Sequence, residues 1–172
     1  MTQPLTAEPG VIVGLQEAFR EAMAQVAAPV SVVTTYAGGR PYGTTVSAFS
    51  SLSMTPPMLL VSLQDTSHLL SLLDVGSSVG VNVLGAGQVE VAGRFAARSA
   101  DKFAGVPWSF ADGAPVLHHT HAWVAMEVSQ LLPVGDHVLV LGDVVNAIAG
   151  AVSGDDTPLT YHRRSFGTHR AH

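Results

Sequence analysis

The sequence predicts a mainly β protein, a closed or nearly closed β-barrel with flanking helices, formed by one domain over residues 1–172. Short segments rich in β-branched residues follow one another and are separated by turn residues, which is typical of sequential antiparallel strands. Helical segments do not recur between every pair of strands, as they would beside an open parallel sheet. A chain of this length can bury one full core and is short for two.

The N-terminal part is expected to be a loose arm, residues 1–12, followed by a helix over residues 13–26. Within this helix the apolar side chains recur at steps of four, four and three, which places them on one face: Leu15, Phe19, Met23 and Val26. We expect this face to pack against another surface.

The remaining elements are expected in the following order. Strands cover residues 30–35, 41–49, 58–64 and 79–84, with a hairpin turn at residues 37–40. Thr66 is a candidate cap for a short leucine-rich helix after the third strand. Residues 87–97 and 99–103 have helical patterns. Two long strands, residues 121–131 and 137–148, are joined by a tight connection that contains Gly135, and residues 168–172 form a tail.

The composition limits the classes of function. The formal net charge is −5 and there is no basic run, which argues against a nucleic-acid partner. The absence of cysteine excludes disulfides and thiolate chemistry. Hydrophobic residues make up 47% and charged residues 12%, yet no apolar run reaches membrane-spanning length. We therefore expect a buried subunit interface and no membrane partner, and the N-terminus lacks a signal pattern, which favours a soluble cytoplasmic protein.

Residues 43–53 are the most informative segment. Here a strand enters a turn rich in Ser, Thr and small residues, and the chain leaves through Pro56 and Pro57. Such a segment presents backbone N–H and side-chain hydroxyl groups together, which suits a planar ligand that carries a phosphate. A Ser/Thr-rich turn that satisfies only itself is the alternative.

Five pieces of sequence resemble, in this order, the flavin reductase family, the short-chain NAD(P)H:flavin oxidoreductases that serve two-component monooxygenases. They are residues 43–57 (GTTVSAFSSLSMTPP), 81–84 (VNVL), 98–105 (RSADKFAG), 135–142 (GDHVLVLG) and 158–163 (PLTYHR). The resemblance implies an FMN-binding split barrel that forms a homodimer, with the flavin near the subunit interface. It also implies that NADH or NADPH reduces FMN or FAD, and that the reduced flavin passes to a separate oxygenase.

The first motif is implied to hold the flavin ring. Backbone groups at a strand end could pair with the edge of an isoalloxazine, and the residues placed there are Thr45, Val46, Ser47 and Ala48. Ser51 and Ser53 would project on one side of an extended chain. Together with Thr66, Ser67 and His68, at a helix start that favours anions, they could hold the ribityl chain and the phosphate. An ordinary helix cap is the alternative for Ser67.

The second and third motifs are implied to add polar and cationic contacts. Asn82 interrupts an apolar strand, where an amide needs a partner, either the flavin or a neighbouring loop. Lys102 is the only lysine of the chain, and a phosphate-bearing ligand needs a cation. Ser99, Lys102 and Phe103 are therefore candidate flavin contacts, with Arg98 as a second cation. A solvated surface group is the alternative for Lys102.

The fourth and fifth motifs are implied to serve the nicotinamide. In the family, the histidine that corresponds to His137 lies beside the nicotinamide and the flavin ring, where an imidazole can donate a hydrogen bond. A turn histidine bonded to Asp136 is the alternative. Tyr161 and Arg163 would close over the cofactor, since aromatic and guanidinium groups suit a dinucleotide.

Other chemistries find less support in the sequence. His119 and His121 could share a strand face, but a third ligand has no obvious source, so we expect no metal site. There is no Gly-x-Ser-x-Gly elbow for a hydrolase and no dinucleotide-binding glycine fingerprint. The alternative function is a non-catalytic FMN-binding or electron-carrier module of the same barrel.

Overall fold

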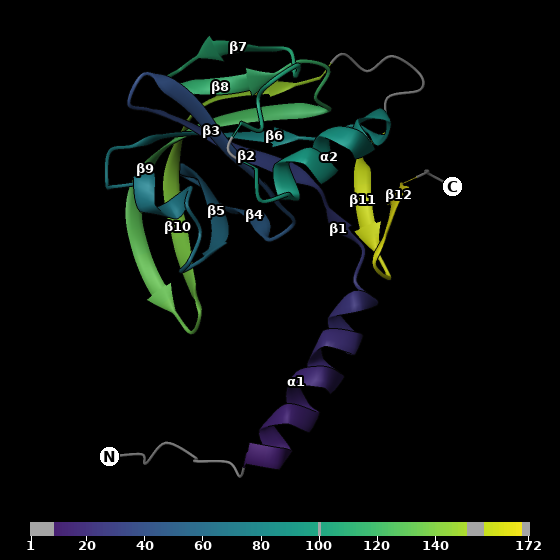
Figure 1. The fold of residues 1–172 in the computed structure, drawn as a ribbon. Coiled ribbons are helices and arrows are strands. Elements are labelled where there is room, and N and C mark those ends of the chain that lie inside the picture. Colours follow the sequence, from purple (N-terminus) through teal and green to yellow (C-terminus); the bar gives the residue numbers. More distant parts are fainter. Residues whose placement is uncertain (1–8, 100, 151–156, 170–172) are drawn as a thin grey trace, which may run out of the picture.

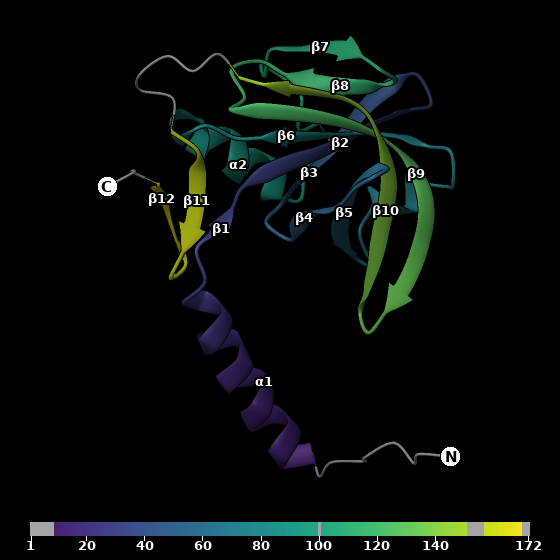
Figure 2. The same cartoon turned by 180° about the vertical axis from the view of Figure 1, so that it is seen from behind.

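The computed structural model describes residues 9–99, 101–150 and 157–169, with side chains described from residue 14. Its centre is a seven-stranded antiparallel sheet that curls into a split barrel (Figures 1 and 2). In spatial order its strands are β3 (Arg40–Val46), β2 (Ser31–Ala37), β6 (Ser78–Val83), β9 (Ala122–Val134), β10 (His137–Ala149), β5 (Pro57–Gln64) and β4 (Phe49–Met54). The two edge strands β3 and β4 are joined by Ser47 and Ala48, and the Ser62 N–H of β5 donates to the Ala48 carbonyl at 2.8 Å.

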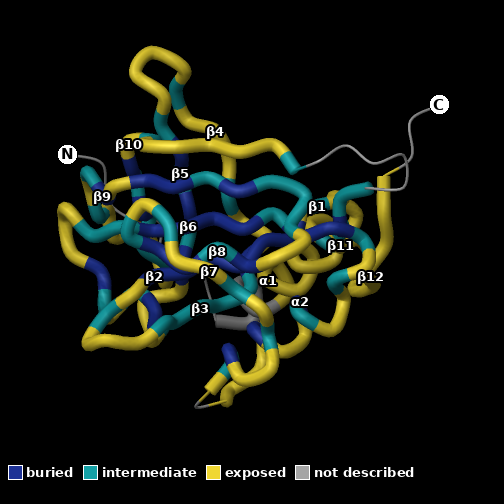
Figure 3. The backbone as a smooth tube through the Cα atoms, turned by 90° about the horizontal axis from the view of Figure 1, so that it is seen from above, coloured by how far each residue is buried: buried dark blue, intermediate teal, exposed yellow. Residues whose placement is uncertain are grey.

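Two apolar cores lie on opposite faces of the central strands. Val32 and Val33 are neighbours in β2 and both have 0% exposure, because successive strand side chains point to opposite faces and both faces are covered. Val33 belongs to the barrel interior, and Val32 packs with Phe95 under the helix α2 (Val89–Ala96). Figure 3 shows the buried residues running along these central strands.

Smaller elements surround the barrel. A three-stranded sheet consists of β1 (Ala28–Pro29), β11 (Leu159–His162) and β12 (Ser165–Thr168), and a hairpin consists of β7 (Trp108–Ala111) and β8 (Ala114–Leu117). Two short 3₁₀ helices are η1 (Leu70–Leu72) and η2 (Ala86–Gln88). The first long strand, β9, continues to Val134, three residues beyond the expected end at residue 131. Only Gly135 and Asp136 therefore lie between β9 and β10.

The sequence prediction of a helix over residues 99–103 is wrong. The described residues of this segment form turns, in which the Asp101 carboxylate accepts hydrogen bonds from the N–H groups of Phe103 and Ala104 at 3.1 Å. An aspartate that bonds the backbone two and three residues ahead stabilises a turn in competition with a continuing helix.

The helix α1 (Pro9–Ala24) extends away from the barrel (Figure 1). It begins before the expected boundary, so residues 9–12 are not a loose arm; residues 1–8 lie outside the described part. Its C-terminal end is held by Arg163, whose N–H donates to the Ala24 carbonyl at 2.8 Å. The expected apolar face exists but stays exposed in the single chain, at 68% for Leu15 and 64% for Phe19. Among the described residues, no helix is long and apolar enough to cross a membrane.

Candidate functional site: a cationic pocket at an edge strand

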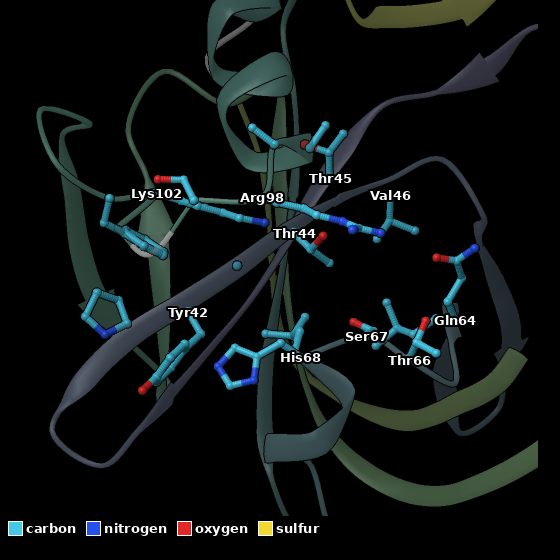
Figure 4. A pocket seen from close by; sticks show the side chains of 18 of the residues that line it. Tyr42, Thr44, Thr45, Val46, Gln64, Thr66, Ser67, His68, Arg98 and Lys102 are labelled. Atoms are coloured by element: carbon cyan, nitrogen blue, oxygen red, sulfur yellow. The ribbon is translucent and has the colours of Figure 1, made fainter.

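A pocket of about 890 Å³ opens between strand β3, the loop that follows β5, and the segment that follows α2 (Figure 4). Its size lies in the range of cofactor sites. Three stretches of chain and one further residue line it: residues 40–48, residues 62–64 and 66–69, residues 96–99 and 101–103, and His137. Stretches far apart in the sequence therefore meet here only through the fold.

Strand β3 is an edge of the main sheet, so no strand among the described residues pairs with its outer backbone groups. The side of β3 that faces α2 is closely packed. The Thr45 hydroxyl donates to the Ala92 carbonyl at 2.6 Å, and a Cβ at Gly43 would lie 2.8 Å from the Phe95 ring. Thr45 therefore fixes the helix against the strand through its hydroxyl, while its backbone remains part of the pocket wall.

Hydroxyl groups surround the middle of the pocket. Thr44, Ser47 and Thr66 line it, and their hydroxyls have no partner among the described residues. Ser67 also lines it, with its Oγ 3.5 Å from the Leu70 N–H, which is a weak cap for the 3₁₀ helix η1. The expected cap by Thr66 is not formed. A polar ligand could therefore use several hydroxyl groups without breaking strong protein hydrogen bonds.

The segment after α2 gives the pocket its charge. Arg98 and Lys102 both project into it (Figure 4). The Lys102 ammonium donates to the Phe95 carbonyl at 2.7 Å, and partial burial lowers the pKa of this lysine. Arg40 adds a third cation to the lining, whereas the Asp101 carboxylate is directed to backbone N–H groups. A chain with a net charge of −5 thus concentrates three of its eight Lys and Arg residues at one site.

His137 reaches the same pocket from the first position of β10, where it pairs with Gln64 of β5. Its Nδ1 lies 2.7 Å from the Asp136 carboxylate, and this hydrogen bond holds the pKa of the Asp136 carboxyl below its ordinary value. This bond is the one expected from the alternative interpretation of the sequence, in which His137 is a turn histidine bonded to Asp136. It coexists with a place in the pocket wall, because a ring bonded through Nδ1 keeps Nε2 for another partner.

The pocket brings together most of the site residues that the sequence indicates. These are Thr45, Val46, Ser47, Ala48, Ser67, Ser99, Lys102, Phe103 and His137. Phe103 is 7% exposed and packs edge-on against Phe95, so its main contact is with the core under α2.

Asn82 is not brought to the pocket. Its side chain is fully buried, donates to the Val32 carbonyl at 3.1 Å and accepts from the Leu117 N–H at 2.8 Å. It therefore connects the main sheet to the β7–β8 hairpin. This outcome corresponds to the structural alternative, in which a buried amide finds backbone partners.

Four other expected contacts also lie outside the pocket lining. Ser51 and Ser53 belong to the opposite edge strand, and a register shift between them breaks the two-residue alternation on which their prediction depended. Tyr161 packs against Phe166 in the β11–β12 hairpin, at 5.3 Å between ring centroids. Arg163 bonds α1 instead, through its backbone and through a 2.8 Å hydrogen bond to the Gln25 side chain.

The sequence reasoning missed Arg40, Tyr42 and Gln64 as lining residues. Tyr42 and Gln64 could have been inferred from the sequence, because each belongs to a strand that flanks or overlaps the motif of residues 43–57. Arg40 was read only as part of a hairpin turn, and its approach to residues 66–69 depends on the curl of the sheet.

The chemistry of the pocket fits a flavin nucleotide. An exposed strand edge can pair with the donor and acceptor atoms of a planar ring, and hydroxyls that have no partner in the described part of the chain can bind a ribityl chain. Arg98 and Lys102 can neutralise a phosphate. The pocket also keeps His137 at one wall, where it could meet a second ligand stacked on the first.

Comparisons with known proteins agree with this chemistry. Residues 23–170 match the family described as the flavin reductase like domain. An NADH:FMN oxidoreductase from Rhodococcus qingshengii is 38% identical over 154 residues, which cover 86% of this chain and 79% of the relative. The reductase component of a 4-nitrophenol 4-monooxygenase/4-nitrocatechol 2-monooxygenase from Rhodococcus opacus is 36% identical over 149 residues, covering 87% and 78%. The solved structure of a nitrilotriacetate monooxygenase component B homolog from Mycobacterium thermoresistibile has a TM-score of 0.87 at 28% identity, covering 92% and 89%. The chain therefore belongs to the flavin reductase family.

Proposed function

We propose that this chain is an NAD(P)H:flavin oxidoreductase, which reduces FMN or FAD and releases the reduced flavin to a separate oxygenase. The observation that carries the proposal is the pocket at β3, where an open strand edge, hydroxyl groups that have no partner among the described residues, three cations and His137 face one space. Relatives that are named as NADH:FMN oxidoreductases or as monooxygenase reductase components support it.

The residues of the chain act by binding and positioning. The chemistry that a flavin would supply here is direct acceptance of a hydride from a reduced nicotinamide, which requires no protein nucleophile. The backbone of Thr45 to Ala48 would orient the ring, and Ser67, Ser99, Arg98 and Lys102 would hold the ribityl phosphate. His137 would be oriented by its Nδ1–H, which donates to the Asp136 carboxylate, and its Nε2 could donate to the negative charge that develops on the flavin when the ring is an imidazolium. Stacking two rings in contact is the main requirement of the reaction.

A homodimer is part of the proposal. The exposed side chains of α1 support it, since Leu15, Phe19 and Met23 are 49% to 68% exposed in the single chain. Burial of the exposed apolar surface of each of these side chains in a dimer interface would stabilise the dimer by about 1 kcal/mol or more. The low charge content of the chain favours the same conclusion. A cytoplasmic location remains an expectation from the sequence.

The deciding experiment is a steady-state assay in air. The purified protein is given NADH or NADPH together with FMN, FAD or riboflavin, and nicotinamide oxidation is followed by absorbance. Turnover that depends on added flavin supports the reductase. Tight FMN binding without oxidation of either nicotinamide would instead favour the carrier module.

A further inference from the structure

We propose that Arg40, Tyr42 and His68 form a subsite for the adenosine diphosphate half of a dinucleotide. This chemistry is common to FAD and to NADH, and it is absent from FMN and from reduced nicotinamide mononucleotide. The proposal rests on the proposed function and extends it to the part of each ligand that takes no part in hydride transfer. We call these three residues the rim corner.

The two rings of the rim corner make a place for a flat base. The ring centroids of Tyr42 and His68 are 5.5 Å apart and their planes are inclined by 79°, so the two rings meet edge to face and together form an aromatic part of the pocket lining. His68 is positioned by Ser71, whose Oγ lies 3.4 Å from His68 Nδ1 and also donates to the His68 carbonyl at 2.8 Å. Adenine stacks on faces of this kind, because every base has a π-face that an aromatic ring can cover.

The third member supplies charge beside the rings. The Arg40 guanidinium lies 5.3 Å from the centroid of the Tyr42 ring, and Arg40 itself lines the pocket. A planar guanidinium matches the oxygens of a phosphate group better than a lysine does. A base stacked at the corner would therefore have its diphosphate next to Arg40.

The rim corner lies on a different element of the pocket from the two cations that follow α2, which suggests that it binds a different part of the ligand. Arg98 and Lys102 lie after α2, whereas Arg40 lies at the first position of β3, six residues before the strand ends at Val46. One flavin phosphate has no need of both sets of cations. Hydride transfer requires the two reacting rings to stack in one space, which leaves the other half of a dinucleotide to contact lining residues outside that space.

The residues that the sequence indicated for dinucleotide binding are engaged elsewhere. Tyr161 packs on Phe166 and Arg163 bonds the end of α1, and neither lines the pocket. The rim corner offers the same chemical groups, an aromatic ring and a guanidinium, inside the pocket.

The test compares ligands with and without the adenosine diphosphate half. Calorimetry measures ADP binding to the flavin-free protein, and titrations measure the Kd for FAD and FMN. Kinetics measure the KM for NADH and for reduced nicotinamide mononucleotide. The variants are Arg40→Gln, Tyr42→Leu and Tyr42→Phe. The control is Tyr36→Leu, because Tyr36 lies on the neighbouring strand, is 40% exposed and contacts Phe110 outside the pocket.

We expect Arg40→Gln and Tyr42→Leu each to weaken ADP binding about tenfold, as loss of one stacking or phosphate contact does. Tyr42→Phe keeps the ring and should resemble the wild type. The values for FMN and reduced nicotinamide mononucleotide should change less than about twofold. A higher Kd for FAD would assign the corner to the flavin, and a higher KM for NADH at constant kcat would assign it to the nicotinamide.

Two results would overturn the proposal. The first is ADP binding that is equal in the wild type and in both Arg40→Gln and Tyr42→Leu. The second is an equal loss for FMN and FAD, which would place the corner at the flavin mononucleotide. The ADP measurement needs no turnover, so a wild type that binds ADP at the corner but never oxidises NADH would refute the proposed function and leave the subsite standing.

Discussion

Lys102→Gln separates recognition of the flavin phosphate from recognition of the flavin ring. Riboflavin has the same ring and ribityl chain as FMN but no phosphate, so it serves as an internal control for every variant. If Lys102 binds the phosphate, the substitution weakens FMN and leaves riboflavin nearly unchanged.

The structure sets the size of the effect. The Lys102 ammonium is partly withdrawn from water and its pKa is lowered by that desolvation, so its charge is less screened than that of a surface lysine. A hydrogen bond to a charged group contributes about 1.5–3 kcal/mol, which corresponds to about 10- to 150-fold in affinity. The pocket is open and Arg98 remains, so we expect the lower part of this range. Loss of the bond to the Phe95 carbonyl costs about 1 kcal/mol of folding stability as well.

The assay is titration of the flavin fluorescence at constant ionic strength. Arg94→Gln is the matched control, because Arg94 is a nearby cation in α2 that bonds the Ala104 carbonyl and does not line the pocket. An equal loss of affinity for FMN and riboflavin in Lys102→Gln would refute the reasoning. A loss of similar size in Arg94→Gln would show a general effect of net charge rather than a phosphate contact.

The pH dependence gives the same prediction a second measurement. A lowered pKa means that Lys102 loses its proton below the ordinary value of 10.5. Only the charged form attracts the phosphate, so FMN affinity should fall as the pH rises through the lowered pKa. The fall should be absent in Lys102→Gln. Riboflavin corrects for ionisation of the flavin ring, which FMN and riboflavin share.

Three further predictions concern other residues. His137→Ala should lower the single-turnover rate of flavin reduction by about 10²-fold or more while FMN affinity changes little, since it removes a donor at the developing charge; an unchanged rate in stopped-flow measurements would remove His137 from the mechanism. Asn82→Ala should lower the free energy of unfolding by about 2–4 kcal/mol in urea titrations, because it leaves the buried Leu117 N–H without a partner; a loss of FMN affinity without a loss of stability would restore Asn82 as a ligand contact. Leu15→Ser with Phe19→Ser should convert a dimer to a monomer in light scattering, and a mass that does not change would show that α1 is not the interface.

Much of the fold was predictable from local patterns. The strands of the barrel follow from β-branched segments and turn residues, and these signals lie within a few residues of each other. The prediction of a helix over residues 99–103 was wrong because the Asp101 side chain accepts hydrogen bonds from backbone N–H groups that a helix would use. Helical periodicity in the sequence does not reveal this competition. The exposed face of α1 has a similar origin, since its pattern requires a partner surface but does not say to which chain that surface belongs.

By itself, the sequence determined the family, the barrel class and the segments that form the pocket, because motif residues such as Ser47 and Lys102 are recognisable without their neighbours. The tertiary structure alone decided which polar residues share one space. Burial assigned Asn82 to the core, a bulge separated Ser51 from Ser53, and the curl of the sheet carried Arg40 and Tyr42 to His68. The physical reason is that distances between distant segments depend on sheet curvature and register, which no short stretch of residues encodes.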